Sequence, residues 1–148
     1  MSEIIKSENT ALATASAIDF DIPEGCICTI DLTTDEGAMK ATNAFGSAAS
    51  LDEYLKEAKS DEFVITDIVT KNGVRAQSDN EPCMDVILIT ADGECLFTQS
   101  NGIYNSVVAM VAACGIERIH RGVRVKRAKI RTRSGNELKQ LRILGFAS

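Results

Sequence analysis

The chain has 148 residues, of which 45% are hydrophobic and 25% are charged, an ordinary composition for a soluble globular protein. It contains no run close to the roughly 18 apolar residues that a transmembrane helix needs. Its acidic N-terminus also lacks the basic and apolar regions of a secretory signal, so neither a membrane span nor secretion is expected. The five cysteines are odd in number and form no CxxC pair, which predicts reduced thiols in a cytosolic compartment.

Charge is divided unevenly along the chain. The formal net charge is −5, but residues 1–100 hold 6 basic and 19 acidic residues, a balance of −13. Residues 101–148 hold 10 basic and 2 acidic residues, a balance of +8, and all ten cations lie between Arg118 and Arg142. Such asymmetry indicates a polyanionic partner. The alternative is a dipolar protein whose two halves fold against each other.

The first part of the chain predicts an arm, a strand pair and a short helix. Residues 1–24 are polar and small and predict a loosely ordered arm ahead of one domain over residues 25–148. Residues 26–32 are rich in β-branched and apolar side chains and predict a strand, with residues 38–45 as its returning partner. The capping box Ser50-Leu-Asp-Glu begins a short amphipathic helix over residues 51–58.

Strand-like runs then follow at residues 63–69, 74–76, 84–90 and 95–99. A turn is expected at residues 71–73, and Asp92-Gly93 predicts a hairpin between the last two runs. Residues 102–114 predict a largely buried helix that Gly115 ends.

The last two predicted strands, residues 123–133 and 138–144, carry most of the cations. Apolar residues occupy odd positions up to Val125 and even positions from Ala128 onward, so we expect a β-bulge after Lys126. Such a bulge would place six cations on one face: Arg124, Lys126, Arg127, Lys129, Arg131 and Arg133. A bent strand of this kind favours a small closed barrel.

The order of the elements predicts a mainly β fold with one buried helix and one short helix. An oligonucleotide/oligosaccharide-binding (OB) barrel has five strands and commonly a helix between the third and fourth. The helix over residues 102–114 falls at that place. We therefore expect an OB-like five-stranded barrel, with a PC4-like α+β sheet as the alternative.

The sequence gives little support to catalytic, metal or cofactor sites. The single histidine, His120, is expected in a solvated basic loop with no nearby nucleophile to activate. The cysteines at 26, 28, 83 and 95 lack the spacing of a zinc site and predict core thiols. We expect no enzyme activity, no metal and no cofactor.

Binding of single-stranded nucleic acid is the function that the residue types favour. Such binders combine a cationic groove with aromatic side chains on which bases stack. The basic strand would supply the groove, and Lys71 and Arg75 add two further cations. Phe97 and Tyr104 flank the turn before the predicted helix and are the candidates for stacking.

Several short motifs, taken in order, resemble a known family. They are AMKATNAF at residues 38–45, SLDE at 50–53, FVITDIV at 63–69, GVR at 73–75 and ILITADGECLFTQSNGI at 87–103. The order resembles the single-stranded-DNA-binding proteins of bacteriophages that infect Gram-positive hosts, over about residues 26–145. The matching positions are Gly73, Arg75, Asp92, Gly93, Phe97, Gln99, Ser100, Gly102 and Ile103, mostly turn and packing residues.

The resemblance implies a cofactor-free protein with an OB-type barrel that coats and protects displaced single strands during phage DNA replication, in the host bacterial cytoplasm. Its candidate partners are single-stranded DNA, a second copy of the chain and phage replication proteins. The alternative function is a non-enzymatic protein-interaction or oligomerisation module. In that case the acidic and basic faces would pair between subunits, or an apolar hairpin would assemble edge to edge.

Overall fold

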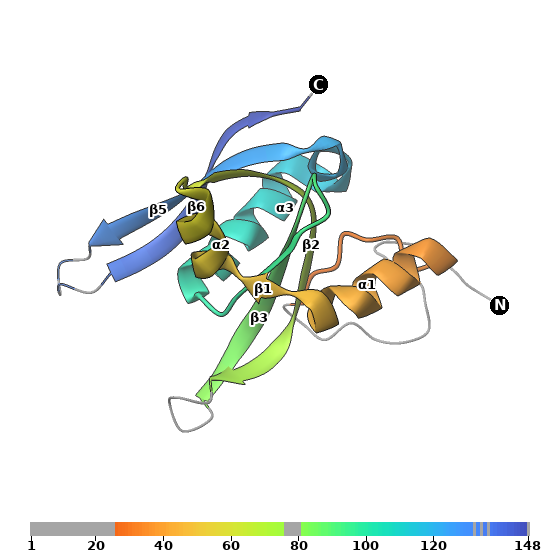
Figure 1. Ribbon diagram of the computed structural model, residues 1–148, viewed down its shortest axis with the longest axis horizontal. Helices are drawn as coiled ribbons and strands as arrows, with labels where there is room; N and C mark the ends of the chain where they lie inside the picture. The colour runs from red at the N-terminus through yellow and green to blue at the C-terminus, as the bar shows by residue number, and fades with distance from the viewer. Residues whose placement is uncertain (1–25, 76–80, 132, 134, 136, 148) are drawn as a thin grey trace.

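The computed structural model describes residues 26–75, 81–131, 133, 135 and 137–147, which form one six-stranded sheet and three helices (Figure 1). The expected arm, residues 1–24, lies outside the described residues. The helices are α1 (Asp35–Ser47), α2 (Leu51–Ala58) and α3 (Asn101–Arg121). The strands are β1 (Ala49–Ser50), β2 (Glu62–Arg75), β3 (Glu81–Thr90), β4 (Cys95–Thr98), β5 (Val123–Arg131) and β6 (Glu137–Phe146).

The sheet has the order β1-β4-β3-β2-β5-β6 and curls into a half-barrel (Figure 1). The short β1–β4 pair is parallel, and the other pairs are antiparallel. β2 pairs with β5 near its start and with β3 from Ile65 onward, and its register shifts between Ile65 and Asp67. A bulge at this point bends β2, so that one strand serves both partners. β1 and β6 are the two ends of this sheet, so the described strands form an open half-barrel rather than the expected five-stranded closed one.

Two apolar clusters lie on opposite faces of the sheet. The larger one fills the concave face beneath α2 and α3, and it includes Leu51, Ile68, Leu88 and Leu96. The smaller one lies on the other face beneath α1 and includes Ala44, Val69, Ile87 and Ile89. Alternation along the strands separates the two sets, because neighbouring residues point to opposite faces. The middle of the sheet is therefore covered on both sides.

The strand pair expected at residues 26–32 and 38–45 is wrong. Residues 38–45 belong to α1, which Thr34 caps by accepting a hydrogen bond from the Gly37 amide at 3.0 Å. Residues 26–32 form no strand of their own but bridge to β2 at a single position, Cys28 to Val69. The residues of α1 that pack on the sheet have helical spacing: Ala41, Ala44 and Phe45.

β2 continues through the turn expected at residues 71–73. Asn72 pairs with Met84 and Gly73 with Cys83, so β2 and β3 form a long ribbon that projects from the body (Figure 1). A side chain at position 73 would overlap the Asp85 carboxylate. Gly73 therefore allows the Asp85 side chain to pack closely across the two strands, and it does not form a turn.

The expectations for α2 and for the β3–β4 hairpin are confirmed. α2 spans residues 51–58, and Ser50 Oγ accepts a hydrogen bond from the Glu53 amide at 3.4 Å. β3 and β4 pair around the expected turn, where Gly93 has a φ of 87°.

α3 is longer and less buried than the sequence predicts. Gly115 has φ 81° and ψ 158°, so it kinks the helix, which then continues to Arg121. One face of α3 is buried and the other is open: Ile103, Val107 and Met110 belong to the core, whereas Val108 is 41% exposed. No helix in the described part of the chain is long and apolar enough to cross a membrane.

The first half of α3 lies against β6. Ser106 Oγ accepts a hydrogen bond from the Leu141 amide at 3.0 Å. A Cβ at Gly102 would overlap the backbone oxygen of Lys139, so helix and strand approach backbone to backbone. α3 thereby occupies part of the free edge of β6, at one end of the sheet.

Candidate nucleic-acid interface

The cations of β5 do not share one face, because the bulge expected after Lys126 is absent. Pairing of β5 with β6 is regular from Val125 to Arg131, and the register shift lies between Arg124 and Val125 instead. Val123 and Val125 are fully buried. Alternation therefore divides the cations: Arg127, Lys129 and Arg131 lie on the face of Val125, whereas Arg124 and Lys126 lie on the outer face.

Arg127 explains the misleading sequence pattern, because it is a cation at a core-facing position. Its side chain is only 10% exposed and is ion-paired with Asp52 of α2 and with Asp61, the latter at 3.1 Å from Nη2 to Oδ1. Two carboxylates compensate for the burial of the guanidinium. Its Nε is buried and has no hydrogen-bond partner within the described part of the chain.

A cleft of about 460 Å³ lies between α2, the turn that follows it and the β5–β6 hairpin. We term it the hairpin cleft. Five cations line it, together with two carboxylates: Lys56, Lys59, Arg127, Lys129 and Lys139, with Asp52 and Asp61. Leu55 and Ser60 complete the lining. The cleft thus has an excess of positive charge in a chain whose net charge is −5.

Lys56 and Lys59 are functional candidates that the sequence prediction missed. Lys56 belongs to the last turn of α2, and Lys59 caps the helix in a left-handed conformation with φ 56°. The sequence does indicate them: Asp52, Lys56 and Lys59 have the i, i+4, i+7 spacing that places residues on one helix face. Both lysines belong to the acidic half of the sequence, so the balance of charge along the chain does not indicate them.

Asp52 lies at the centre of this cleft. Its Oδ1 pairs with Arg127, and its Oδ2 accepts a hydrogen bond from Lys139 Nζ at 3.0 Å. Burial by itself would raise the pKa of the Asp52 carboxyl. The hydrogen bond from Lys139, with the charges of Lys139, Arg127 and Lys129, lowers that pKa below its ordinary value. The carboxylate is therefore held in its charged form.

The remaining hairpin cations that the structure describes are exposed and do not line the hairpin cleft. Lys126 and Arg142 are cross-strand neighbours on the outer face, which Arg124 also shares. Arg131 and Arg133 lie exposed toward the hairpin turn.

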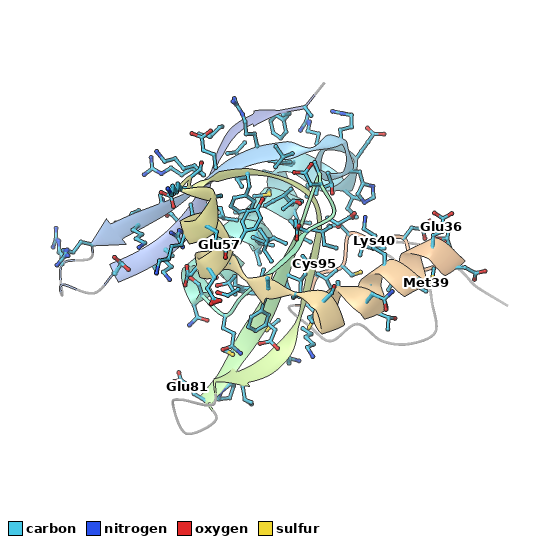
Figure 2. All side chains as sticks on the ribbon, in the orientation of Figure 1. Glu36, Met39, Lys40, Glu57, Glu81 and Cys95 are labelled. Carbon is cyan, nitrogen blue, oxygen red and sulfur yellow. The ribbon has the colours of Figure 1, made fainter. Side chains whose placement is uncertain are left out.

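The structure does not bring Lys71 and Arg75 to the hairpin cleft. Both belong to the β2–β3 ribbon, which projects from the body in a different direction from the β5–β6 hairpin (Figure 1). Lys71 Nζ lies over the Phe45 ring of α1, 4.7 Å from its centroid. Arg75 pairs along the backbone with Glu81, which Figure 2 labels at the outer end of the ribbon.

The two candidate stacking residues lie on opposite faces of the sheet. Phe97 packs against the smaller cluster beneath α1, and Tyr104 packs against the larger cluster on the concave face. Both side chains are half-buried. One continuous DNA path cannot use both without passing around the sheet.

His120 lies on α3, not in the solvated loop that the sequence predicts. Its Nε2 is 2.8 Å from the Thr29 carbonyl oxygen and 3.0 Å from Asp67 Oδ1. Asp67 is buried and also accepts hydrogen bonds from Thr29 Oγ1 at 2.8 Å and from Lys40 Nζ at 2.6 Å. Lys40, Asp67 and His120 border a hollow of about 590 Å³ beside α1, where Figure 2 labels Lys40. They join α1, β2, α3 and the segment before α1.

The five cysteines are half-buried rather than fully buried core thiols. Burial raises the pKa of the Cys28 thiol, and a hydrogen bond with the Ile30 backbone opposes part of this rise. Over the described ranges, no group of three or more His, Cys, Asp or Glu side chains is placed to hold a metal ion.

Comparisons of the chain with protein-family models, with curated proteins and with solved structures found no match.

Proposed function

We propose that the chain is a sequence-tolerant single-stranded-DNA-binding protein that coats and protects single strands during phage DNA replication. The observation that carries the proposal is the hairpin cleft, where five cations meet two carboxylates in an otherwise acidic chain. Contacts between cations and phosphates give affinity that is independent of base sequence. Acidic surface elsewhere would repel a polyanion and favour one path across the protein.

The proposed path continues from the cleft along β5. Arg127, Lys129 and Arg131 occupy alternate positions on one face, and alternate residues of a strand lie about 6.6 Å apart. They therefore form a row of charges that leads from α2 toward the hairpin turn. Arg127 is held by its two carboxylates, so Lys129 and Arg131 are the residues of this row that we assign to phosphate contacts.

We assign base stacking to Tyr104 rather than to Phe97. Tyr104 belongs to the first turn of α3, and this turn contacts β6 beside Lys139, a residue of the cleft. Phe97 lies on the opposite face of the sheet.

The fold supports the proposal only as an analogy. A curled sheet with a helix across its concave face is compatible with an OB-like barrel, a class that binds oligonucleotides. The resemblance to phage single-stranded-DNA-binding proteins suggests the same function.

The test compares two double variants of equal charge. Lys129→Ala with Arg131→Ala removes two cations from the proposed path, and Arg124→Ala with Lys126→Ala removes two from the outer face. Fluorescence anisotropy with a labelled oligo-dT should show the larger loss of affinity for the first pair. Its salt slope should also be flatter by about 1.4, or 0.7 for each lost phosphate contact. Equal losses for both pairs would contradict the proposed path.

The second candidate function, an oligomerisation module, is favoured by one observation. β6 ends the sheet and carries exposed apolar side chains, including Leu138, Leu144 and Phe146 at 40%, 41% and 49% exposure. Edge strands with such side chains tend to pair with other chains. Size-exclusion chromatography with and without oligonucleotide, at low and high salt, separates the two functions. An oligomer that forms without oligonucleotide at every salt concentration favours the second.

A further inference from the structure

The contacts of Asp52 resemble those that a bound phosphate would make. Its two oxygens engage Arg127 and Lys139, and Lys129 lines the same cleft. The Asp52 side chain is 57% exposed, so water and solutes can reach the carboxylate. The carboxylate is thus an anion already seated among the cations of the hairpin.

Arg127 has a hydrogen-bond donor that its partners do not use. Asp52 and Asp61 pair with Nη1 and Nη2, while the buried Nε makes no hydrogen bond within the described part of the chain. The side chain is nine-tenths buried and its position is fixed from two sides. The guanidinium is therefore a fixed positive charge in the wall of the cleft, and it favours an anion beside the lysines that solvent can reach.

We infer that Lys129 and Lys139, beside the fixed guanidinium of Arg127, form a phosphate subsite of the hairpin cleft, and that the Asp52 carboxylate occupies it in the free protein. An arriving phosphate takes Lys139 and Lys129, Asp52 turns toward solvent, and Asp61 keeps Arg127 in place. That the phosphate belongs to single-stranded DNA rests on the proposed function. The subsite itself rests on the side chains alone.

This competition selects for polyanions. Asp52 is attached to the protein, so it competes at a high effective concentration that a single phosphate group in solution cannot match. A DNA strand offers several phosphates at once, and its neighbouring contacts along β5 offset the displacement. The subsite should therefore bind a free phosphate weakly and a strand well.

The direct test is Asp52→Asn, with Glu57→Gln as the matched control. Both variants remove one negative charge from α2, but Glu57 does not line the cleft (Figure 2). The asparagine keeps an oxygen that can accept from Arg127.

Asp52→Asn should bind an oligo-dT 20-mer about fivefold more tightly than the natural chain. This is the effect of one unit charge about 4 Å from a phosphate in water. Glu57→Gln should change the affinity less than about twofold in 0.1 M salt, because exposed charges at longer range are screened. Equal gains for the two variants, or weaker binding by Asp52→Asn, would overturn the inference.

Pyrophosphate, titrated by calorimetry, is the probe that separates this inference from the proposed function. If no variant binds the oligonucleotide but Asp52→Asn binds pyrophosphate more tightly than the natural chain, the subsite stands and the proposed function fails. If the natural chain binds the oligonucleotide and Asp52→Asn gains affinity for neither probe, the inference fails alone. If neither probe binds any variant, both fail.

If Asp52→Asn does not fold, the natural chain and a third variant, Lys139→Gln, test the inference instead. Pyrophosphate should then shift the backbone amide resonances of Asp52 and Lys139 in the natural chain, and Lys139→Gln should abolish these shifts. The absence of shifts in the natural chain would overturn the inference.

Discussion

Arg127 and Lys129 lie two residues apart on one face of β5, and substitutions at these positions should separate stability from binding. The Arg127 side chain is 10% exposed and pairs with two carboxylates. Lys129 is exposed and makes no ion pair within the described residues. Arg127→Met retains most of the apolar stem and removes both ion pairs, whereas Lys129→Met removes a solvated charge.

The exposure of the partners sets the expected loss of stability. Asp52 and Asp61 are 57% and 49% exposed, so water can solvate them again when Arg127 is removed. Each pair should then contribute up to about 1 kcal/mol, as exposed pairs do, rather than the roughly 3–5 kcal/mol of a broken buried pair. Arg127→Met should lower the free energy of unfolding by about 1–2 kcal/mol and Tm by roughly 3–6 °C. Lys129→Met should change the free energy of unfolding by less than about 0.5 kcal/mol.

The pH dependence provides a second readout for Arg127. Despite the opposing effect of burial, the hydrogen bond from Lys139 and the nearby cations lower the pKa of the Asp52 carboxyl. A carboxyl with a lowered pKa in the folded state stabilises the fold above its ordinary pKa, and this contribution is lost as the pH falls through the folded-state value. The stability difference between the natural chain and Arg127→Met should therefore be full at pH 7 and shrink below the ordinary value of 3.8.

Urea and thermal unfolding followed by circular dichroism measure both effects, with oligo-dT binding measured in parallel. A loss above about 4 kcal/mol would mean that the Arg127 pairs behave as fully buried ones. An unchanged Tm would mean that they contribute nothing. Oligonucleotide affinity that falls further for Arg127→Met than for Lys129→Met would make Arg127 a direct DNA contact and refute the reasoning.

Three further predictions concern packing, the cleft and the joint at His120. Gly102→Ala should destabilise the protein by about 1–3 kcal/mol, because the new Cβ overlaps the Lys139 oxygen and forces α3 away from β6; an unchanged urea midpoint would show that the helix shifts freely. Lys56→Ala with Lys59→Ala should weaken oligo-dT binding and flatten its salt slope, and an unchanged slope would remove α2 from the interface. His120→Gln should speed hydrogen exchange at the Thr29 and Thr70 amides, which bond the segment before α1 to β2; unchanged exchange would show that Asp67 and Lys40 hold the joint alone.

Elements with strong local signals were predictable from the sequence. The Ser50 cap of α2 and the Asp92-Gly93 turn act within four residues, so no distant contact is needed to recognise them. α1 was missed because small residues such as Ala41 and Ala44 give little contrast between its two faces. Asn72-Gly73 is a strong turn signal that long-range pairing with β3 overrides.

The candidate site was predictable in composition but not in geometry. The sequence indicates a cation-rich hairpin, but its alternation predicts six cations on one face, because a buried arginine produces the same pattern as a change of register. Arg127 faces the core because Asp52 and Asp61 compensate for its charge, and both carboxylates precede it by more than 60 residues. Lys56 and Lys59 reach the cleft only through the packing of α2 beside the hairpin. The periodicity of a short segment cannot indicate contacts between residues that are so far apart in the sequence.

The salt dependence of oligo-dT binding tests the central claim most directly. With three to four phosphates contacted along the hairpin cleft and β5, the plot of log K against log salt concentration should have a slope of about −2 to −3. A homopolymer of another base should bind with a similar slope, because the contacts are with the backbone. No measurable binding at low salt, or binding whose affinity does not change with salt, would contradict the claim that this cleft binds single-stranded DNA.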